Sequence, residues 1–85
     1  MQANPSHIVV TTEEDPILAV RAASVYHRHF PEIRGEGHSR AAAIARLAEH
    51  LCRTLDNVPS DWRRERLLEA IADVRAFAEE DLAST

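Results

Sequence analysis

The chain contains no lysine and a single cysteine, Cys52, among its 85 residues. One cysteine excludes an internal disulfide, so packing and hydrogen bonds have to hold the fold together. No segment approaches the roughly 20 consecutive apolar residues of a membrane span. The opening residues, MQANPSH, have neither the basic end nor the apolar run of a signal peptide. We therefore expect a cytoplasmic protein with no membrane association.

Aromatic residues are also scarce, at 5% of the chain, although apolar residues make up 45% of it. Fourteen of the apolar residues are alanines, which bury little area each. A domain of this length buries only about 60% of the surface of its unfolded chain, and alanine makes the core thinner still. We therefore predict one domain over residues 1–85 that pairs with a second copy as a homodimer.

Basic residues are fewer than acidic residues. Ten basic residues, all of them arginines, stand against fourteen acidic residues, which gives a formal net charge of −4 and a pI near 5.7. Proteins that follow a phosphate backbone carry the opposite balance, so the composition argues against a nucleic-acid partner. Because the arginine guanidinium is planar, it forms bidentate pairs with carboxylates and stacks on aromatic rings.

The first half of the chain has the pattern of short strands. β-branched residues dominate residues 7–12, and side chains alternate with a period of two over residues 18–28. A third strand at residues 31–35 would begin with a proline, which predicts an edge strand or a bulge. The alternative is a helix over residues 17–30, which would give an all-α three-helix bundle. We favour two or three antiparallel strands, because a lone first strand would have no partner.

The second half of the chain changes to the helical period of 3.6 residues. We predict amphipathic helices at residues 39–56 and 60–80, with Ser39 and Ser60 as their N-caps. The predicted buried stripes consist of Ile44, Leu47, Ala48, Leu51 and Leu55 in the first helix, and of Leu67, Ala70, Ile71, Val74, Phe77 and Ala78 in the second.

The order of these elements, strands first and two helices after them, is that of an α+β fold. We expect both ends of the chain, residues 1–6 and 82–85, to be disordered. Cys52 follows Leu51 on the first helix, and we expect it to be a small core residue rather than a reactive thiol.

Residues 30–51, with the sequence FPEIRGEGHSRAAAIARLAEHL, resemble the strand-to-helix segment of the HicB-type antitoxin family. The residues that carry the resemblance are Phe30, Pro31, Glu32 and Ile33 in the strand, Gly37 in the turn, Ser39 as the capping hydroxyl and Ala43 in the first helical turn. The segment departs from the family in two alanines that replace acids, and nothing after residue 57 resembles an added DNA-binding element. The resemblance implies a sandwich of sheet and helix that binds and neutralises a protein partner.

Five histidines are many for a chain of this length, and His27 and His29 are two residues apart. On a strand, that spacing puts two imidazoles on one face, as a shared metal ion requires. His38 across the turn is the candidate third ligand, and His7 or Glu32 could complete the set. The sequence assigns no carboxylate to orient these rings. An exposed edge strand with polar faces explains the same spacing without a metal, and we therefore predict no cofactor.

The most basic stretch is Trp62-Arg63-Arg64-Glu65-Arg66. A tryptophan beside arginines can stack on a base and hold phosphates, which makes nucleic-acid binding through this cluster the alternative function. Acidic residues interleave with the arginines and weaken that interpretation. We instead expect Trp62 to seal the junction of the two helices, and the arginines to pair with carboxylates.

No catalytic or nucleotide-binding motif is present. The pair of glycines at Gly35 and Gly37 precedes a helix, but a phosphate loop would need a third glycine and a lysine. We therefore predict a protein-interaction or regulatory module rather than an enzyme, with a sheet edge or a helix face as its binding surface. The predicted partner-binding residues are Phe30, Glu32, Arg34, Trp62, Arg63 and Arg66.

Overall fold

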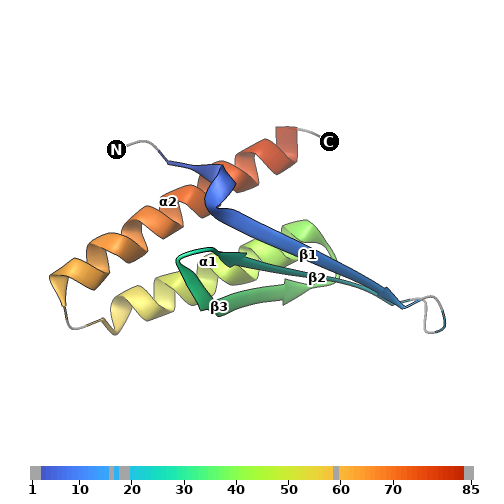
Figure 1. Cartoon of the computed structure of the whole chain (residues 1–85), viewed down its shortest axis with the longest axis horizontal. Coiled ribbons are helices and arrows are strands. Elements are labelled where there is room, and N and C mark those ends of the chain that lie inside the picture. The colour runs from blue at the N-terminus through green and yellow to red at the C-terminus, as the bar shows by residue number, and fades with distance from the viewer. Residues whose placement is uncertain (1–2, 16, 18–19, 59, 84–85) are drawn as a thin grey trace.

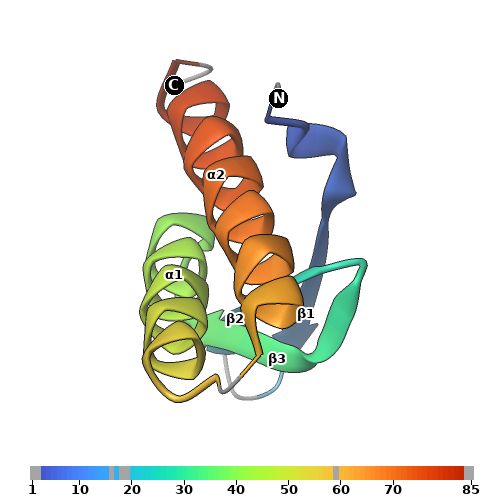
Figure 2. The same cartoon turned by 90° about the vertical axis from the view of Figure 1, so that its left-hand side faces the viewer.

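The computed structural model describes residues 3–15, 17, 20–58 and 60–83. Its elements are, in order, η1 (Pro5–His7), β1 (Ile8–Asp15), β2 (Val20–His27), β3 (Phe30–Gly37), α1 (Arg40–Asp56) and α2 (Asp61–Ala83). The strands form one antiparallel sheet in the order β1-β2-β3. The helices lie side by side on one face of that sheet (Figure 1; Figure 2). The predicted α+β fold is confirmed, and the all-α alternative is wrong because residues 20–27 pair as a strand.

β1 ends three residues later than predicted and β3 extends beyond both of its predicted ends, whereas β2 lies within its predicted range. β1 pairs with β2 along its whole length, from Ile8 opposite His27 to Asp15 opposite Val20. Residues 18–19 of the predicted second strand lie outside the described residues. β3 pairs only with β2 among the described strands, and the register shifts between Tyr26 and His27. The proline in β3 therefore lies on an edge strand next to a bulge, as predicted.

Helix α1 packs closely against the middle of β3. Ser39 caps the helix, because its side-chain oxygen accepts a hydrogen bond from the Ala42 backbone N–H at 3.2 Å. Gly35 lies under this helix, where a Cβ atom would overlap the backbone of Ala43 and Leu47. The absence of a side chain at residue 35 therefore sets the distance between sheet and helix.

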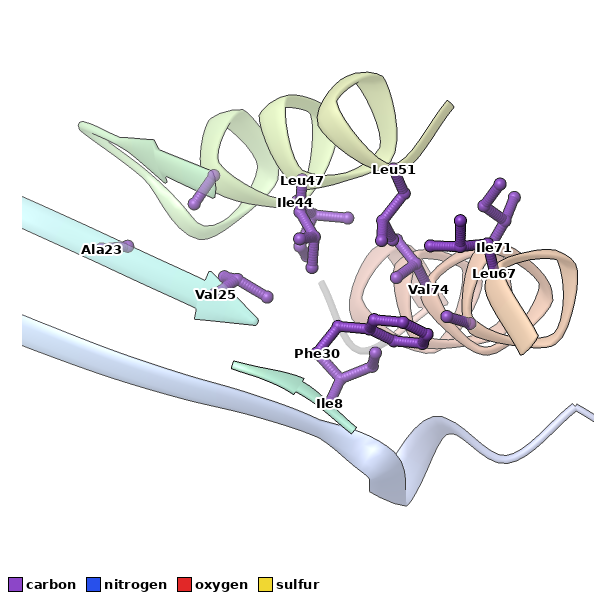
Figure 3. Packing of buried hydrophobic residues seen from close by; sticks show 12 residues of the cluster. Ile8, Ala23, Val25, Phe30, Ile44, Leu47, Leu51, Leu67, Ile71 and Val74 are labelled. Atoms are coloured by element: carbon purple, nitrogen blue, oxygen red, sulfur yellow. The ribbon is translucent and has the colours of Figure 1, made fainter. Parts of the chain in front are cut away.

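The core lies between the sheet and the two helices. Both predicted helical stripes are confirmed in their central turns, and Figure 3 shows their side chains converging with those of the sheet. Only one aromatic ring, that of Phe30, is part of this buried cluster. The other members are Ile8, Ala23, Val25, Ala43, Ile44, Leu47, Leu51, Leu67, Ala70, Ile71 and Val74.

The ends of the chain and Cys52 differ from expectation. Asn4 caps η1, which begins at Pro5, and α2 continues to Ala83, so residues 5–6 and 82–83 lie in helical structure. An ion pair of 3.2 Å between Arg40 and Asp81 ties the far end of α2 to the start of α1. Cys52 is exposed rather than in the core, because it lies one position past Leu51 and therefore about 100° further round the helix.

Both described α-helices are too polar to cross a membrane. Outside the stripe that faces the core, α2 also exposes the apolar side chains of Trp62, Leu68 and Leu82.

We predict that Gly35→Ala destabilises the protein by about 2–3 kcal/mol, since its Cβ meets backbone atoms that cannot rotate away. Urea unfolding followed by circular dichroism measures the change. Glu36→Ala is the matched control, because Glu36 is exposed on the same strand, and we expect a change within about 0.5 kcal/mol. Equal stability of Gly35→Ala and the wild type would contradict the close packing of β3 against α1.

Candidate functional site

A cavity of about 510 Å³ lies where η1, the end of the β2–β3 hairpin and the N-terminal half of α2 meet. Its wall carries three histidines, two arginines, a tryptophan and two carboxylates, with apolar side chains between them. Concave surfaces that combine an apolar lining with a few converging polar groups are the usual binding sites of proteins. This cavity is therefore the candidate functional site.

The carboxylate of Asp73 is the centre of the polar groups in this cavity. Its Oδ2 atom lies 3.0 Å from Nδ1 of His7 and 2.8 Å from Nε2 of His27. Its Oδ1 atom accepts a hydrogen bond of 2.7 Å from the backbone N–H of Asn4. Asp73 thus joins the N-terminal segment, the end of β2 and α2 through one buried side chain.

The hydrogen bonds of His27 fix which of its nitrogens carries the proton. The backbone N–H of His29 donates to Nδ1 of His27 at 3.1 Å, so that nitrogen is unprotonated. The proton is therefore on Nε2, which donates it to Asp73. His27 is a neutral imidazole with both nitrogens hydrogen-bonded and with only 2% of its surface exposed.

The ring of His7 is fixed in a similar way through Asn4. The amide oxygen of Asn4 accepts hydrogen bonds from the backbone N–H and the hydroxyl of Ser6. The amide nitrogen of Asn4 therefore faces Nε2 of His7, at 3.2 Å, and donates to it. This leaves the proton of His7 on Nδ1, where it is donated to Asp73.

The environment of Asp73 favours its charged form. Burial by itself raises the pKa of the carboxyl group, but the hydrogen bonds from the Asn4 amide and from the two imidazoles outweigh that effect. The pKa of Asp73 consequently lies below its ordinary value of 3.8. The pKa of His29 is also lowered, first by desolvation, and the positive charges of Arg28 and Arg66 lower it further.

Helix α2 contributes a second stripe to this cavity, beside the stripe that faces the core. Its members follow at intervals of four, three and four residues, which puts them on one side of a helix: Trp62, Arg66, Glu69 and Asp73. The guanidinium of Arg66 lies 5.5 Å from the centre of the Trp62 ring. One side of α2 therefore stabilises the core while the adjacent side forms the wall of the cavity.

The position of Trp62 corrects a prediction from the sequence. Its side chain is 66% exposed and does not seal the junction of the helices, because Trp62 lies outside the angular range of the core stripe on α2. The prediction that arginines pair with carboxylates is confirmed for Arg63, which lies 3.6 Å from Glu32 of β3. The guanidinium of Arg63 also lies 5.6 Å from the centre of the Phe30 ring.

Four predicted site residues are not part of the cavity wall: Glu32, which pairs with Arg63, and His38, Arg34 and Arg64. His38 follows Gly37, which is opposite Ala23, so His38 is at the other end of the sheet from His27 and is not the third imidazole. His7 takes that place. Arg34 lies on the outer face of the sheet, 5.0 Å from the centre of the Tyr26 ring. Arg64 is exposed and is not part of the cavity wall.

The sequence interpretation missed the orienting carboxylate. Asp73 lies three residues after Ala70 and four residues before Phe77, between apolar positions of α2. An acid placed among buried positions needs a partner, and this was the signal that could have identified it. His7 was named only as a completing ligand because no local pattern relates it to His27.

The arrangement can bind a ligand in two ways. The three imidazoles offer nitrogen lone pairs, while the guanidiniums of Arg63 and Arg66 offer donors to an anion. None of the described residues lining the cavity is a serine, threonine or cysteine, so its imidazoles have no hydroxyl or thiol nearby to activate.

Comparisons with protein-family models, curated proteins and solved structures find no match to this chain. The features on which the resemblance to HicB-type antitoxins depends form the expected local structure: Ser39 caps α1, and Ala43 is buried against β3. Many strand-to-helix connections have that local structure. Membership of the antitoxin family therefore stays a prediction.

We predict that Asp73→Asn lowers the free energy of unfolding by about 1–3 kcal/mol near neutral pH, since one amide cannot accept from all three donors. The ionised carboxylate stabilises the fold fully above pH 3.8, and this contribution is lost as the pH falls through the lower pKa of the folded state. Urea unfolding at a series of pH values should therefore show the difference between the two proteins shrinking below pH 3.8.

Asp56→Asn is the control for this experiment, because Asp56 is exposed at the end of α1. We expect its stability to follow that of the wild type at each pH, within about 0.5 kcal/mol. A difference between Asp73→Asn and the wild type that stays constant with pH would contradict the role assigned to the ionised carboxylate.

Proposed function

We propose that this protein is a non-catalytic interaction module that binds an acidic segment of a partner protein at the rim of the histidine-lined cavity. The observation that carries the proposal is the exposure of Trp62, 66%, beside Arg66 at the cavity wall. Tryptophan and arginine dominate the energetics of protein interfaces, because each combines a large apolar area with directed hydrogen bonds. An exposed tryptophan leaves a large apolar area in water that a partner could cover.

Charge supports an acidic partner. Among the described residues, neither Arg28 nor Arg66 forms an ion pair, whereas Arg63 is partnered by Glu32. Both unpaired arginines are close enough to His29 to lower its pKa. Arg28 and Arg66 are therefore available to pair with carboxylates of a partner.

A regulatory role, as in the HicB-type antitoxins that residues 30–51 resemble, would fit a small domain that acts by covering part of another protein. Nucleic-acid binding uses the same residue types, since a nucleobase can stack on an exposed tryptophan. The carboxylates of Asp61, Glu65 and Glu69 lie among these arginines, and they would repel a phosphate backbone. A protein partner is therefore the better match.

Fluorescence of Trp62, the only tryptophan, tests the proposal. We expect a short peptide of alternating aspartate and leucine to change its emission in a saturable way, and the corresponding lysine–leucine peptide to have no effect. Arg66→Gln should weaken binding of the acidic peptide by about tenfold, equivalent to about 1.4 kcal/mol. Arg46→Gln is the control, because Arg46 is exposed on α1 outside the cavity wall.

Two results would decide against this function. An unchanged emission with the acidic peptide, or equal losses in the two arginine variants, would remove the proposed binding surface. Saturable binding of a short oligouridine at low salt, in the absence of peptide binding, would establish the nucleic-acid alternative instead.

We also infer that the protein forms a homodimer. Its core contains one aromatic ring, and β1 pairs only with β2 among the described strands, which leaves one edge of the sheet available. Multi-angle light scattering should give a mass of about twice 9.5 kDa. A mass of 9.5 kDa over a wide range of concentrations would show a monomer.

A further inference from the structure

Three histidines from separate parts of the fold meet in the cavity. His7 ends η1, His27 ends β2, and His29 lies in the turn between β2 and β3. One ring nitrogen of each lies within 4.8 Å of those of the other two. Their ring centroids are 5.0 to 5.4 Å apart, so no side chain separates them.

Asp73 orients two of these rings in the way that a carboxylate orients metal-binding histidines. It holds the protons of His7 and His27 on the nitrogens that face it. The opposite nitrogens, Nε2 of His7 and Nδ1 of His27, are unprotonated and accept hydrogen bonds of 3.2 and 3.1 Å. A carboxylate behind a histidine fixes the ring orientation and raises the basicity of the free nitrogen.

We propose that His7, His27 and His29 form a binding site for a divalent cation of the zinc class. Imidazole nitrogens suit zinc, copper and nickel, whereas magnesium and calcium prefer oxygen ligands. Three histidines would leave a fourth position for water or for a side chain of a partner. The proposal is independent of the acidic-peptide function, because it depends on the histidines and not on Trp62.

Binding requires a small closure of the cluster. Zinc–nitrogen bonds are about 2.0–2.1 Å long, which puts the ligand nitrogens of a tetrahedral site about 3.4 Å apart. The cation would replace the hydrogen bonds now accepted by His7 and His27, and His29 is free to approach because it is exposed on a turn.

Side chains of both charge signs surround the three histidines and act on a bound cation in opposite directions. The carboxylates of Asp73 and Glu69 lie in the cavity wall and attract a cation. Arg28 and Arg66 are close enough to lower the pKa of His29, and their positive charges would repel a cation bound there. Removing the charge of Arg66 should therefore tighten metal binding, whereas the same change weakens binding of an acidic peptide. The Arg66→Gln protein thus separates this proposal from the proposed function.

Titration of the full chain with zinc chloride, by calorimetry and by NMR of the histidine rings, tests the site. We expect saturable binding of one zinc ion, with the ring resonances of His7, His27 and His29 shifting and those of His38 and His50 unchanged. Magnesium chloride should produce neither effect. Cobalt chloride gives a second readout, since cobalt bound by nitrogen ligands in a tetrahedral site has strong visible absorption.

His29→Ala is the decisive variant, because the His29 ring is exposed and forms no hydrogen bond among the described residues. It should weaken zinc binding by about tenfold or more while the circular dichroism spectrum stays unchanged. His38→Ala is the matched control and should bind like the wild type. Unmoved ring resonances, or equal zinc affinity of His29→Ala and the wild type, would overturn the proposal.

Discussion

The carboxylate of Asp73 is the single group on which the rest of the site depends. It is buried, and a buried charge is tolerated only when its hydrogen-bonding capacity is filled. The three donors come from Asn4, His7 and His27, which are distant from Asp73 in the chain. Satisfying one carboxylate therefore fixes the start of the chain, the end of β2 and the middle of α2 relative to one another.

The same constraint explains why this small domain has a cavity at one end. Helix α2 packs on α1 through its apolar stripe, and its neighbouring stripe faces the N-terminal segment through polar groups (Figure 2). The hydrogen bonds between α2 and the N-terminal segment keep the two at a fixed separation, because each donor has a preferred distance and direction to its acceptor. Apolar side chains would let them approach more closely. The rim of this space exposes Trp62 and Arg66.

Several features could be predicted from the sequence because their causes are local. Alternation, the 3.6-residue period and the serine cap at Ser39 each depend on neighbours within a few residues, and each was confirmed. The spacing of His27 and His29 predicted two neighbouring imidazoles on one face of a strand. The two rings are neighbours, but His29 lies in the turn after β2 and not on the strand. The predictions that Cys52 is buried and that Trp62 seals the helix junction were wrong. On a helix with apolar side chains on more than one side, the angle at which the helix packs decides which side is covered.

The sequence by itself determined the type and order of the elements, the capping of the helices and the stripe of each helix that enters the core. Only the tertiary structure decided that His7 and Asp73 are in contact, and that His38 is at the opposite end of the sheet from His27. The physical reason is that periodicity specifies the face of an element, whereas contacts between elements follow from register and from helix placement. Gly35 sets that placement by letting α1 approach β3, and the position of α2 over the histidines follows from it.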